Sequence, residues 1–160
     1  MENSDLNQVY EQIEETLQTY GYFFTVTNKM QAESDKEIEA MTMRQLFLLV
    51  GLEAFGDYDP SLQELAYIFG SSYQNVKRMA LQLEEDGYLS IRKDSKDRRK
   101  IRLKLNRANY DKLMEDTRAD VDTFFGKVFR GISAEELQNV SRILAKINSN
   151  LDDVDAVEEN

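Results

Sequence analysis

The sequence contains no cysteine and no histidine in its 160 residues. Their absence excludes disulfides, thiol redox chemistry, the usual tetrahedral zinc sites and every catalytic mechanism based on imidazole. Thirty Asp and Glu residues are present, but in a helical chain they are typical of solvated helix faces. The only proline is Pro60, so the rest of the chain can form long helices. We therefore expect a helical protein that is not an enzyme and holds no metal or cofactor.

Long apolar runs are missing as well. No segment approaches the roughly 18 uninterrupted apolar residues of a membrane span, and Met1–Asp5 lacks the basic and then apolar pattern of a secretory signal. The length and the apolar share of 41% suit one compact globular domain. We therefore expect a folded cytoplasmic protein that has no membrane partner.

The net charge of −10 is unevenly distributed along the chain. Between Ser90 and Arg107 lie nine basic and two acidic residues, a local charge of +7, which leaves −17 for the remainder. Such a polarised field concentrates anions at one place. The same basic cluster also suits a strand edge that is protected against aggregation, which is the alternative interpretation.

Two kinds of helix are predicted in the first half of the chain. Apolar residues spaced three and four apart predict a long amphipathic helix from Asp5 to about Ala32, followed by a charged separator at Glu33–Ala40. Capping boxes at Thr42 and Ser61 then predict the starts of two shorter core helices. The turn-forming segment Gly56–Pro60 separates these two helices.

A third core helix follows after a short glycine turn. Gly70 ends the preceding helix, Ser71 or Ser72 caps the next one, and Gly87 lies where a left-handed residue ends helices. Two helices that meet at a short turn form a helix-turn-helix.

The apolar period changes to two after Gly87. Leu89–Ile91 and Ile101–Leu105 predict an antiparallel ribbon with apolar side chains toward the helices and Arg92, Arg102 and Lys104 outward.

Helical patterns return at Asn106. They predict two amphipathic helices, the second running from the capping box at Ser133 to Leu151, and a frayed acidic tail.

The predicted fold class is mainly α with a small β-ribbon, in which a winged helix-turn-helix core is flanked by long N- and C-terminal dimerisation helices. Its regions are an N-terminal dimerisation helix (1–40), a winged helix-turn-helix (41–106), C-terminal dimerisation helices (107–151) and an acidic tail (152–160). The outer helices carry more apolar surface than one small core can cover, which favours a homodimer. Folding of these helices back onto the same subunit is the alternative.

A helix-turn-helix followed by a basic hairpin suits duplex DNA, because the major groove admits one α-helix and the start of that helix meets the base edges. The candidate contacts on the recognition helix are Ser72, Tyr73, Gln74, Asn75, Lys77 and Arg78. The candidate contacts on the wing are Arg92, Lys93, Lys96, Asp97, Arg98, Arg99 and Lys100. Wing arginines suit a narrow minor groove, whose negative potential attracts guanidinium groups. Either feature alone also suits a plain solvated surface, but the two in this order favour DNA binding.

The segment from about Thr42 to Asn106 resembles the MarR regulators of bacteria. The residues that carry the resemblance are Met41–Gln45 in the first core helix, Glu64–Gly70, Val76, Arg78 and Leu83–Leu89 in the helix-turn-helix, and Asp97–Arg99, Leu105 and Asn106 in the wing. The resemblance implies that Asp97 supports Arg99 in the minor groove, with Arg98 toward the DNA backbone. Asn106 departs from the usual threonine, and a glycine expected shortly after it is absent; asparagine caps helices equally well.

The resemblance also implies an obligate homodimer, a pseudo-palindromic operator and, in many members, a small aromatic ligand between the dimer helices and the DNA-binding part. The candidate effector-pocket residues are Tyr20, Tyr22, Phe23, Phe24 and Phe47, although aromatic residues at helical spacing are also typical of a core. The predicted function is a DNA-binding transcriptional regulator that acts as a repressor. The alternative is a winged-helix adaptor that binds an acidic protein surface instead of DNA, which the net charge of −10 favours.

Overall fold

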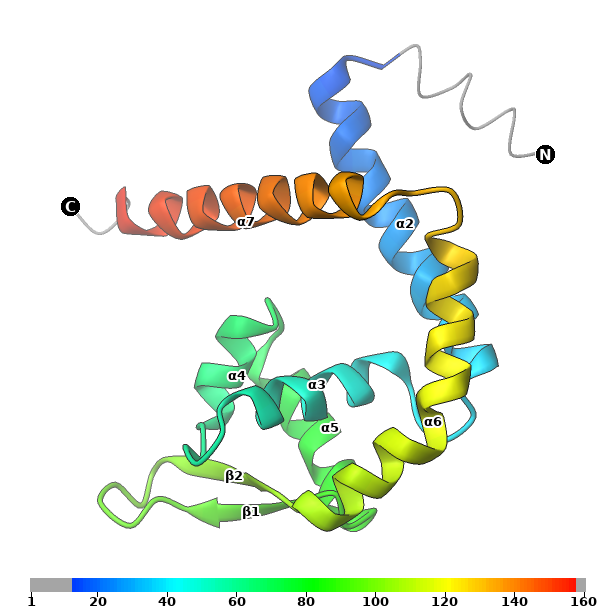
Figure 1. The fold of residues 1–160 in the computed structure, drawn as a ribbon. Helices are drawn as coiled ribbons and strands as arrows, with labels where there is room; N and C mark the ends of the chain where they lie inside the picture. Colours follow the sequence, from blue (N-terminus) through cyan, green and yellow to red (C-terminus); the bar gives the residue numbers. More distant parts are fainter. Residues whose placement is uncertain (1–12, 158–160) are drawn as a thin grey trace. The chain divides into compact units, whose positions relative to one another are not determined.

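The structure is a computed structural model that describes residues 13–157. Its elements are α2 (Glu15–Glu37), α3 (Met43–Ala54), α4 (Leu62–Ile68), α5 (Tyr73–Glu85), β1 (Leu89–Lys93), β2 (Ile101–Leu105), α6 (Arg107–Val128) and α7 (Ala134–Val157) (Figure 1). The predicted mainly helical fold with one antiparallel hairpin is therefore confirmed. Across residues 13–157, no helix combines the length and the apolar character needed to cross a bilayer.

The chain divides into two compact units. Unit 1 extends to Phe124, and unit 2 begins at Phe125. The boundary falls inside α6, within the region predicted to form the C-terminal dimerisation helices. Unit 1 therefore contains the whole helix-turn-helix and its hairpin.

The two capping boxes predicted for the core helices are present and fix where α3 and α4 begin. At α3 the Thr42 hydroxyl accepts from the Gln45 amide at 3.3 Å, and the Gln45 side chain accepts from the Thr42 amide at 3.0 Å. At α4 the corresponding distances between Ser61 and Glu64 are 3.2 and 2.6 Å. Each box satisfies two backbone donors that the first helical turn leaves without partners.

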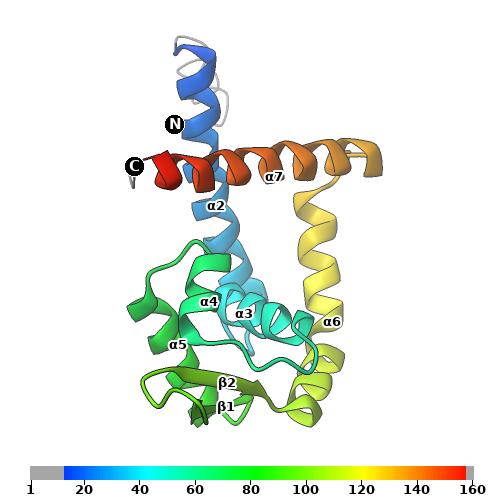
Figure 2. The ribbon, with the colours of Figure 1, turned by 90° about the vertical axis from the view of Figure 1, so that its left-hand side faces the viewer.

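The core of unit 1 lies between α3, α4, α5 and the hairpin (Figure 2). α5 packs against α4 and β1, and α3 packs against β2. The fully buried side chains include Leu48, Leu49, Leu65, Val76, Leu83 and Leu103. Each such side chain contributes about 1.5–3 kcal/mol relative to an exposed one, so these contacts hold helices and hairpin together as one body.

The hairpin has the predicted antiparallel pairing, with Leu89 opposite Leu105 and Ile91 opposite Leu103. Leu89 and Leu103 are buried, and Lys104 is exposed, as the two-residue period predicts. Arg102 departs from this prediction. It is half-buried, and its backbone pairs with Ser61 in an isolated bridge that extends the ribbon locally.

Both outer helices end later than predicted, and the first also starts later. Residues 13 and 14 are not helical, so the prediction of one helix from Asp5 is wrong; α2 begins at Glu15 and runs into the expected separator as far as Glu37. Within this extension Lys36 pairs with Glu33 at 2.7 Å and Ser34 is buried. α7 continues past Leu151 to Val157, so six residues of the expected frayed tail are helical. A helix that is already nucleated extends at little cost even where its apolar pattern weakens, which explains both later ends. Residues 5–12 of the predicted first helix and the last three residues of the tail lie outside the described residues.

Candidate nucleic-acid interface

Helix α5, the predicted recognition helix, is capped by Ser72, whose hydroxyl accepts from the Asn75 amide at 3.2 Å. Its inner face is buried through Val76, Ala80 and Leu83. Tyr73, Gln74 and Arg78, together with Ser72, are exposed, whereas Asn75 and Lys77 are half-buried. The start of α5 is therefore open to a ligand, as a groove-binding helix requires.

Asn75, a predicted base-reading side chain, makes hydrogen bonds within the protein at both ends of its amide, and its contact with a base stays a prediction. Its amide nitrogen donates to the Ser71 hydroxyl at 3.0 Å, and its amide oxygen accepts from Arg78 Nη2 at 3.0 Å. Both ends of the side chain that would pair with adenine already have partners. Asn75 thus orients Arg78, and Gln74 is the exposed amide at the start of the helix.

The wing consists of β1, β2 and the wing loop, residues 94–100. Asp94 folds this loop, because its Oδ1 accepts from the backbone amides of Lys96 at 2.7 Å and Asp97 at 2.9 Å. The Asp97 amide and, next, the guanidinium of Arg102 hold the pKa of Asp94 well below its ordinary value. The loop therefore has a defined shape in which Asp94 stays ionised.

Asp97 and Arg99 form the contact that the family resemblance implies. Asp97 Oδ1 accepts from the Arg99 backbone amide at 3.1 Å and from Arg99 Nε at 3.2 Å. The Arg99 side chain is nevertheless 91% exposed. Asp97 thus directs a guanidinium outward without covering it.

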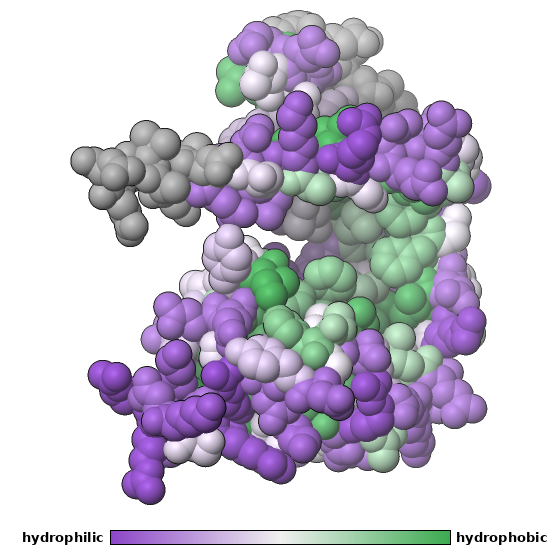
Figure 3. Space-filling view, turned by 60° about the vertical axis from the view of Figure 1, so that its left-hand side comes forward, coloured by the Kyte–Doolittle hydropathy of each residue, from purple (hydrophilic) through white to green (hydrophobic). Residues whose placement is uncertain are grey.

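The other candidate wing cations are exposed and make no ion pair with any residue in 13–157; they are Arg92, Lys93, Lys96, Arg98 and Lys100. The wing therefore presents several uncompensated positive charges, two at the end of β1 and three on the wing loop. Figure 3 shows a hydrophilic surface at the lower edge of unit 1, where the wing lies, and a more apolar surface above it. Such a charge distribution suits a polyanion.

Arg102 is bound inside the protein, which corrects the prediction that it points outward. Its Nε donates to Asp94 Oδ2 at 2.7 Å, and its Nη1 donates to the Tyr58 hydroxyl at 2.7 Å and to the Asp59 carbonyl at 3.1 Å. A third contact joins Nη1 to Glu64 Oε2 at 3.3 Å. We call Arg102 and these four partners the Arg102 cluster.

The charges of the Arg102 cluster stabilise one another. The Tyr58 hydroxyl, which donates to Glu64 at 2.6 Å, together with the capping contacts of Ser61, lowers the pKa of Glu64 to about 2. Hydrogen bonding to Asp94 and then to Tyr58 raises the pKa of Arg102. Sequence patterns did not indicate this cluster. The only signal was the turn-forming Gly56–Pro60 segment, which gives no hint of a partner in the wing.

The candidate effector-pocket residues are exposed aromatic side chains on two helices. Tyr20, Tyr22, Phe23 and Phe24 are exposed on α2, and Phe47 on α3 is 61% exposed. Tyr20 contacts Phe24 edge-to-face, with ring centroids 4.9 Å apart, and Phe47 contacts Phe69 in the same way at 5.4 Å. None of the five lines either of the two cavities described in unit 1. The pocket stays a prediction.

Each unit also exposes a row of large apolar side chains on a long helix. In unit 1 this row lies on α2 and includes Leu17, Tyr20 and Phe24, each more than half exposed. In unit 2 it lies on α7 and comprises Val140, Ile143, Leu144 and Leu151. Apolar surface gathered in this way marks an interaction face more often than a solvated one.

The fold matches many solved structures of bacterial regulators, although no family model matches the sequence. A MarR family transcriptional regulator from Rhodococcus sp. RHA1 is 19% identical, with a TM-score of 0.71 over 85% of this chain and 96% of that one. The organohalide-sensing transcriptional regulator RdhR, bound to 2,4-dichlorophenol, is 17% identical, with a TM-score of 0.72 over 88% of this chain and 83% of that one. MepR of S. aureus, in complex with DNA, is 21% identical, with a TM-score of 0.65 over 82% of this chain and 96% of that one.

Proposed function

We propose that this chain, which has the winged-helix fold of the MarR regulators, is a transcriptional regulator that binds duplex DNA. In this proposal α5 enters the major groove and Arg99 enters the adjacent minor groove. The observation that carries it is the combination of an exposed helix start with a wing whose cations are uncompensated. The two are parts of one rigid body, because α5 packs on β1 and Glu84 of α5 accepts from the Ile91 amide at 2.6 Å.

The proposal includes a homodimer. The exposed apolar rows on α2 and α7 support it, because burying them against a second copy would remove a large apolar surface from water. A two-fold dimer repeats its half-sites about one DNA turn apart, which predicts a pseudo-palindromic operator. We place the protein in the cytoplasm, where a regulator of bacterial genes meets its DNA.

The proposal also includes repression that a small aromatic effector relieves. The support is the group of exposed aromatic side chains on α2 and α3, and the 2,4-dichlorophenol bound to one structure of the same fold. An effector acts only if it binds one dimer conformation more tightly than another. Tyr20, Tyr22, Phe23, Phe24 and Phe47 are the residues that we assign to this site.

The test is a titration of the full chain onto the DNA upstream of its own gene and onto random duplex, each at several salt concentrations. We expect binding to the upstream DNA to be at least about 1,000-fold tighter, and both affinities to fall steeply with salt. Light scattering of the same samples reports the oligomeric state. Equal affinity for the two duplexes would falsify the proposal of a specific regulator.

The net charge of −10, which disfavours binding to DNA, favours a second candidate, a winged-helix adaptor that binds an acidic surface of another protein in place of DNA. This alternative predicts that DNA binding is weak at every salt concentration. The salt titration therefore separates the two functions, since only the regulator depends on counterion release from DNA.

A further inference from the structure

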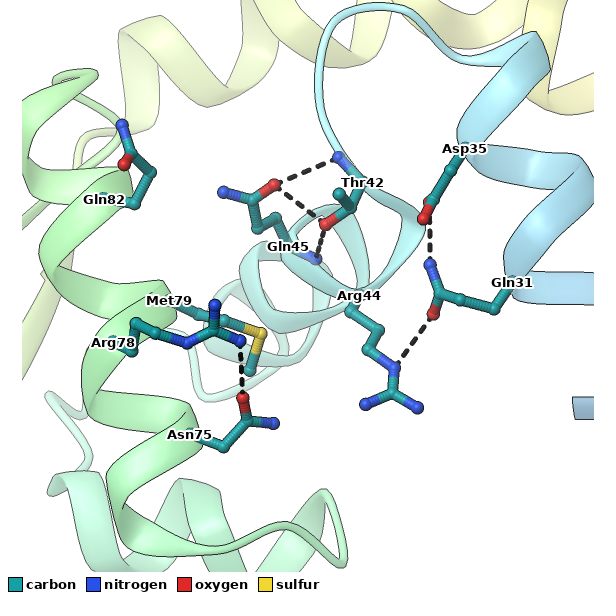
Figure 4. A pocket seen from close by; sticks show the side chains of 9 residues that line it. All are labelled: Gln31, Asp35, Thr42, Arg44, Gln45, Asn75, Arg78, Met79 and Gln82. Atoms are coloured by element: carbon teal, nitrogen blue, oxygen red, sulfur yellow. Dashed lines mark hydrogen bonds between the residues drawn. The ribbon is translucent and has the colours of Figure 1, made fainter. Parts of the chain in front are cut away.

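A polar cavity of about 410 Å³ lies beside the recognition helix, between α2, α3 and α5. Figure 4 shows that two arginines border it from different elements, Arg44 from α3 and Arg78 from α5. Neither residue belongs to the wing, and Arg44 is not one of the predicted DNA contacts. The cavity thus adds a second cationic feature to unit 1.

The side-chain amide of Gln31 orients Arg44. Arg44 Nε donates to Gln31 Oε1 at 2.9 Å, and the Gln31 amide nitrogen in turn donates to Asp35 Oδ1 at 2.7 Å. Asp35 Oδ1 also accepts from the Met43 backbone amide at 3.0 Å, which fixes the carboxylate at the start of α3. The Gln31 contact uses Nε and leaves both terminal nitrogens of Arg44 for a ligand.

A second amide orients Arg78 in the same manner. Arg78 Nη2 donates to Asn75 Oδ1, and Asn75 donates onward to the Ser71 hydroxyl, each at 3.0 Å. The guanidinium keeps its other nitrogens for a ligand. Because both guanidiniums are held before anything binds, little side-chain entropy is lost when a ligand arrives.

Neither guanidinium is neutralised by a carboxylate. Within residues 13–157 neither Arg44 nor Arg78 makes an ion pair, and both are exposed. Asp35 is the only carboxylate that lines the cavity, so the lining carries two positive charges and one negative charge. A polar site with a net positive charge and unused guanidinium donors selects a compact anion.

We propose that Arg44 and Arg78 together bind a phosphate group beside the recognition helix. Two sources share this chemistry. One is a backbone phosphate at the edge of the groove that receives α5, and this source rests on the proposed function. The other is a free phosphorylated small molecule, which would occupy the same place and compete with DNA.

The experiment compares the full chain with Arg44→Gln, which removes the charge, and with Arg44→Lys, which keeps the charge but loses the planar fork. Arg130→Gln, a change of an exposed arginine in unit 2, is the matched control. Each protein is titrated onto upstream and random duplex over a range of salt. In a second arm, inorganic phosphate is added to DNA-free protein while the arginine Nε–H resonances of Arg44 and Arg78 are followed by NMR.

If the ligand is a DNA phosphate, we expect Arg44→Gln to weaken binding to both duplexes by the same factor. The slope of log affinity against log salt concentration, which we call the salt slope, should fall in magnitude by about 0.9. Arg44→Lys should restore the slope but only part of the affinity. For a free phosphate, the two arginine resonances should shift on addition of phosphate, and Arg44→Gln should abolish the shift at Arg78. That second result would support the site even if the protein bound no DNA, so it separates failure of the site from failure of the proposed function. An unchanged salt slope together with no phosphate-dependent shift overturns the site.

Discussion

Arg99 and Arg102 lie in the same hairpin, yet the protein uses them in opposite ways. Arg99 contacts one carboxylate and is 91% exposed, whereas Arg102 contacts two carboxylates, a phenol and a backbone carbonyl and is 23% exposed. The Tyr58 ring also lies 5.2 Å below the Arg102 guanidinium. A basic residue in a wing can therefore either attach the wing to the protein or present charge to a ligand.

This comparison changes how the local charge of +7 is interpreted. Of the nine cations between Ser90 and Arg107, three make ion pairs in the described part of the chain: Arg99, Arg102 and Arg107. Arg107 pairs with Glu53 at 2.8 Å, away from the wing loop. The positive charge that remains available to a ligand is therefore concentrated in the wing loop and on the outer face of the strands. Four predictions test this division between basic residues that attach the wing to the protein and basic residues that present charge to a ligand.

The largest expected effect is on stability, from Arg102→Ala. This change leaves Asp94 and Glu64 without their cation, and hydrogen bonds to charged groups contribute about 1.5–3 kcal/mol. We expect urea denaturation at matched protein concentration to show a loss of about 2–3 kcal/mol in the free energy of unfolding. Arg98→Ala, at the exposed wing loop, is the control and should change stability by less than about 0.5 kcal/mol. Equal losses of unfolding free energy for Arg102→Ala and Arg98→Ala would contradict the division between basic residues that attach the wing and those that present charge.

The second effect concerns DNA affinity, from Arg99→Ala. If Arg99 enters the minor groove, its loss should cost about 1–3 kcal/mol, which is roughly 5- to 150-fold in affinity for the upstream DNA. Fluorescence anisotropy measures the affinity, while light scattering and urea denaturation should show unchanged dimerisation and stability. An unaltered affinity would count against the placement of Arg99 in the groove.

The third effect is a pH dependence that the Arg102 cluster produces. The pKa of Glu64 is lowered from 4.5 to about 2 in the folded chain, so the unfolded chain takes up a proton first as the pH falls. The stabilisation is therefore complete above about pH 4.5 and is lost progressively toward pH 2. Because the Glu64 side chain is 43% exposed, solvent screening limits the loss to about 1 kcal/mol.

Glu64→Gln isolates this contribution, since glutamine preserves the capping box but cannot ionise. We expect the stability of this variant to fall less than that of the wild type between pH 5 and pH 2.5, as measured by thermal unfolding. If stability fell by the same amount with pH in the variant and in the wild type, Glu64 would not gain its low pKa on folding.

Local signals in the sequence were sufficient for much of unit 1. The capping boxes at Thr42 and Ser61 and the glycines at 70 and 87, whose φ angles are +52° and +81°, set helix ends through contacts within a few residues. The hairpin followed from the two-residue period because one of its faces is buried. These features depend on neighbours in the chain, which a sequence pattern records directly.

The inward turn of Arg102 could not be predicted in this way. The alternation of β2 places Arg102 on the same side of the strand as Lys104, and only Lys104 is exposed. The difference arises from Tyr58 and Glu64, which precede Arg102 by 44 and 38 residues. A long-range contact of this kind leaves no periodic trace, and the same limit applies to the Gln31–Arg44 contact between α2 and α3.

The smallest expected effect separates two neighbouring residues of the wing loop. Lys100 is an exposed point charge without an ion pair among residues 13–157, whereas Asp97 orients Arg99. Lys100→Gln should therefore remove one phosphate contact. This loss should reduce the salt slope by about 0.9 and weaken binding to all duplexes alike. Arg99→Ala should instead weaken binding most to duplexes with a narrow, A·T-rich minor groove, because the groove potential that attracts arginine depends on its width. If Lys100→Gln discriminated between duplexes as strongly as Arg99→Ala, the orientation of Arg99 by Asp97 would have no role in recognition.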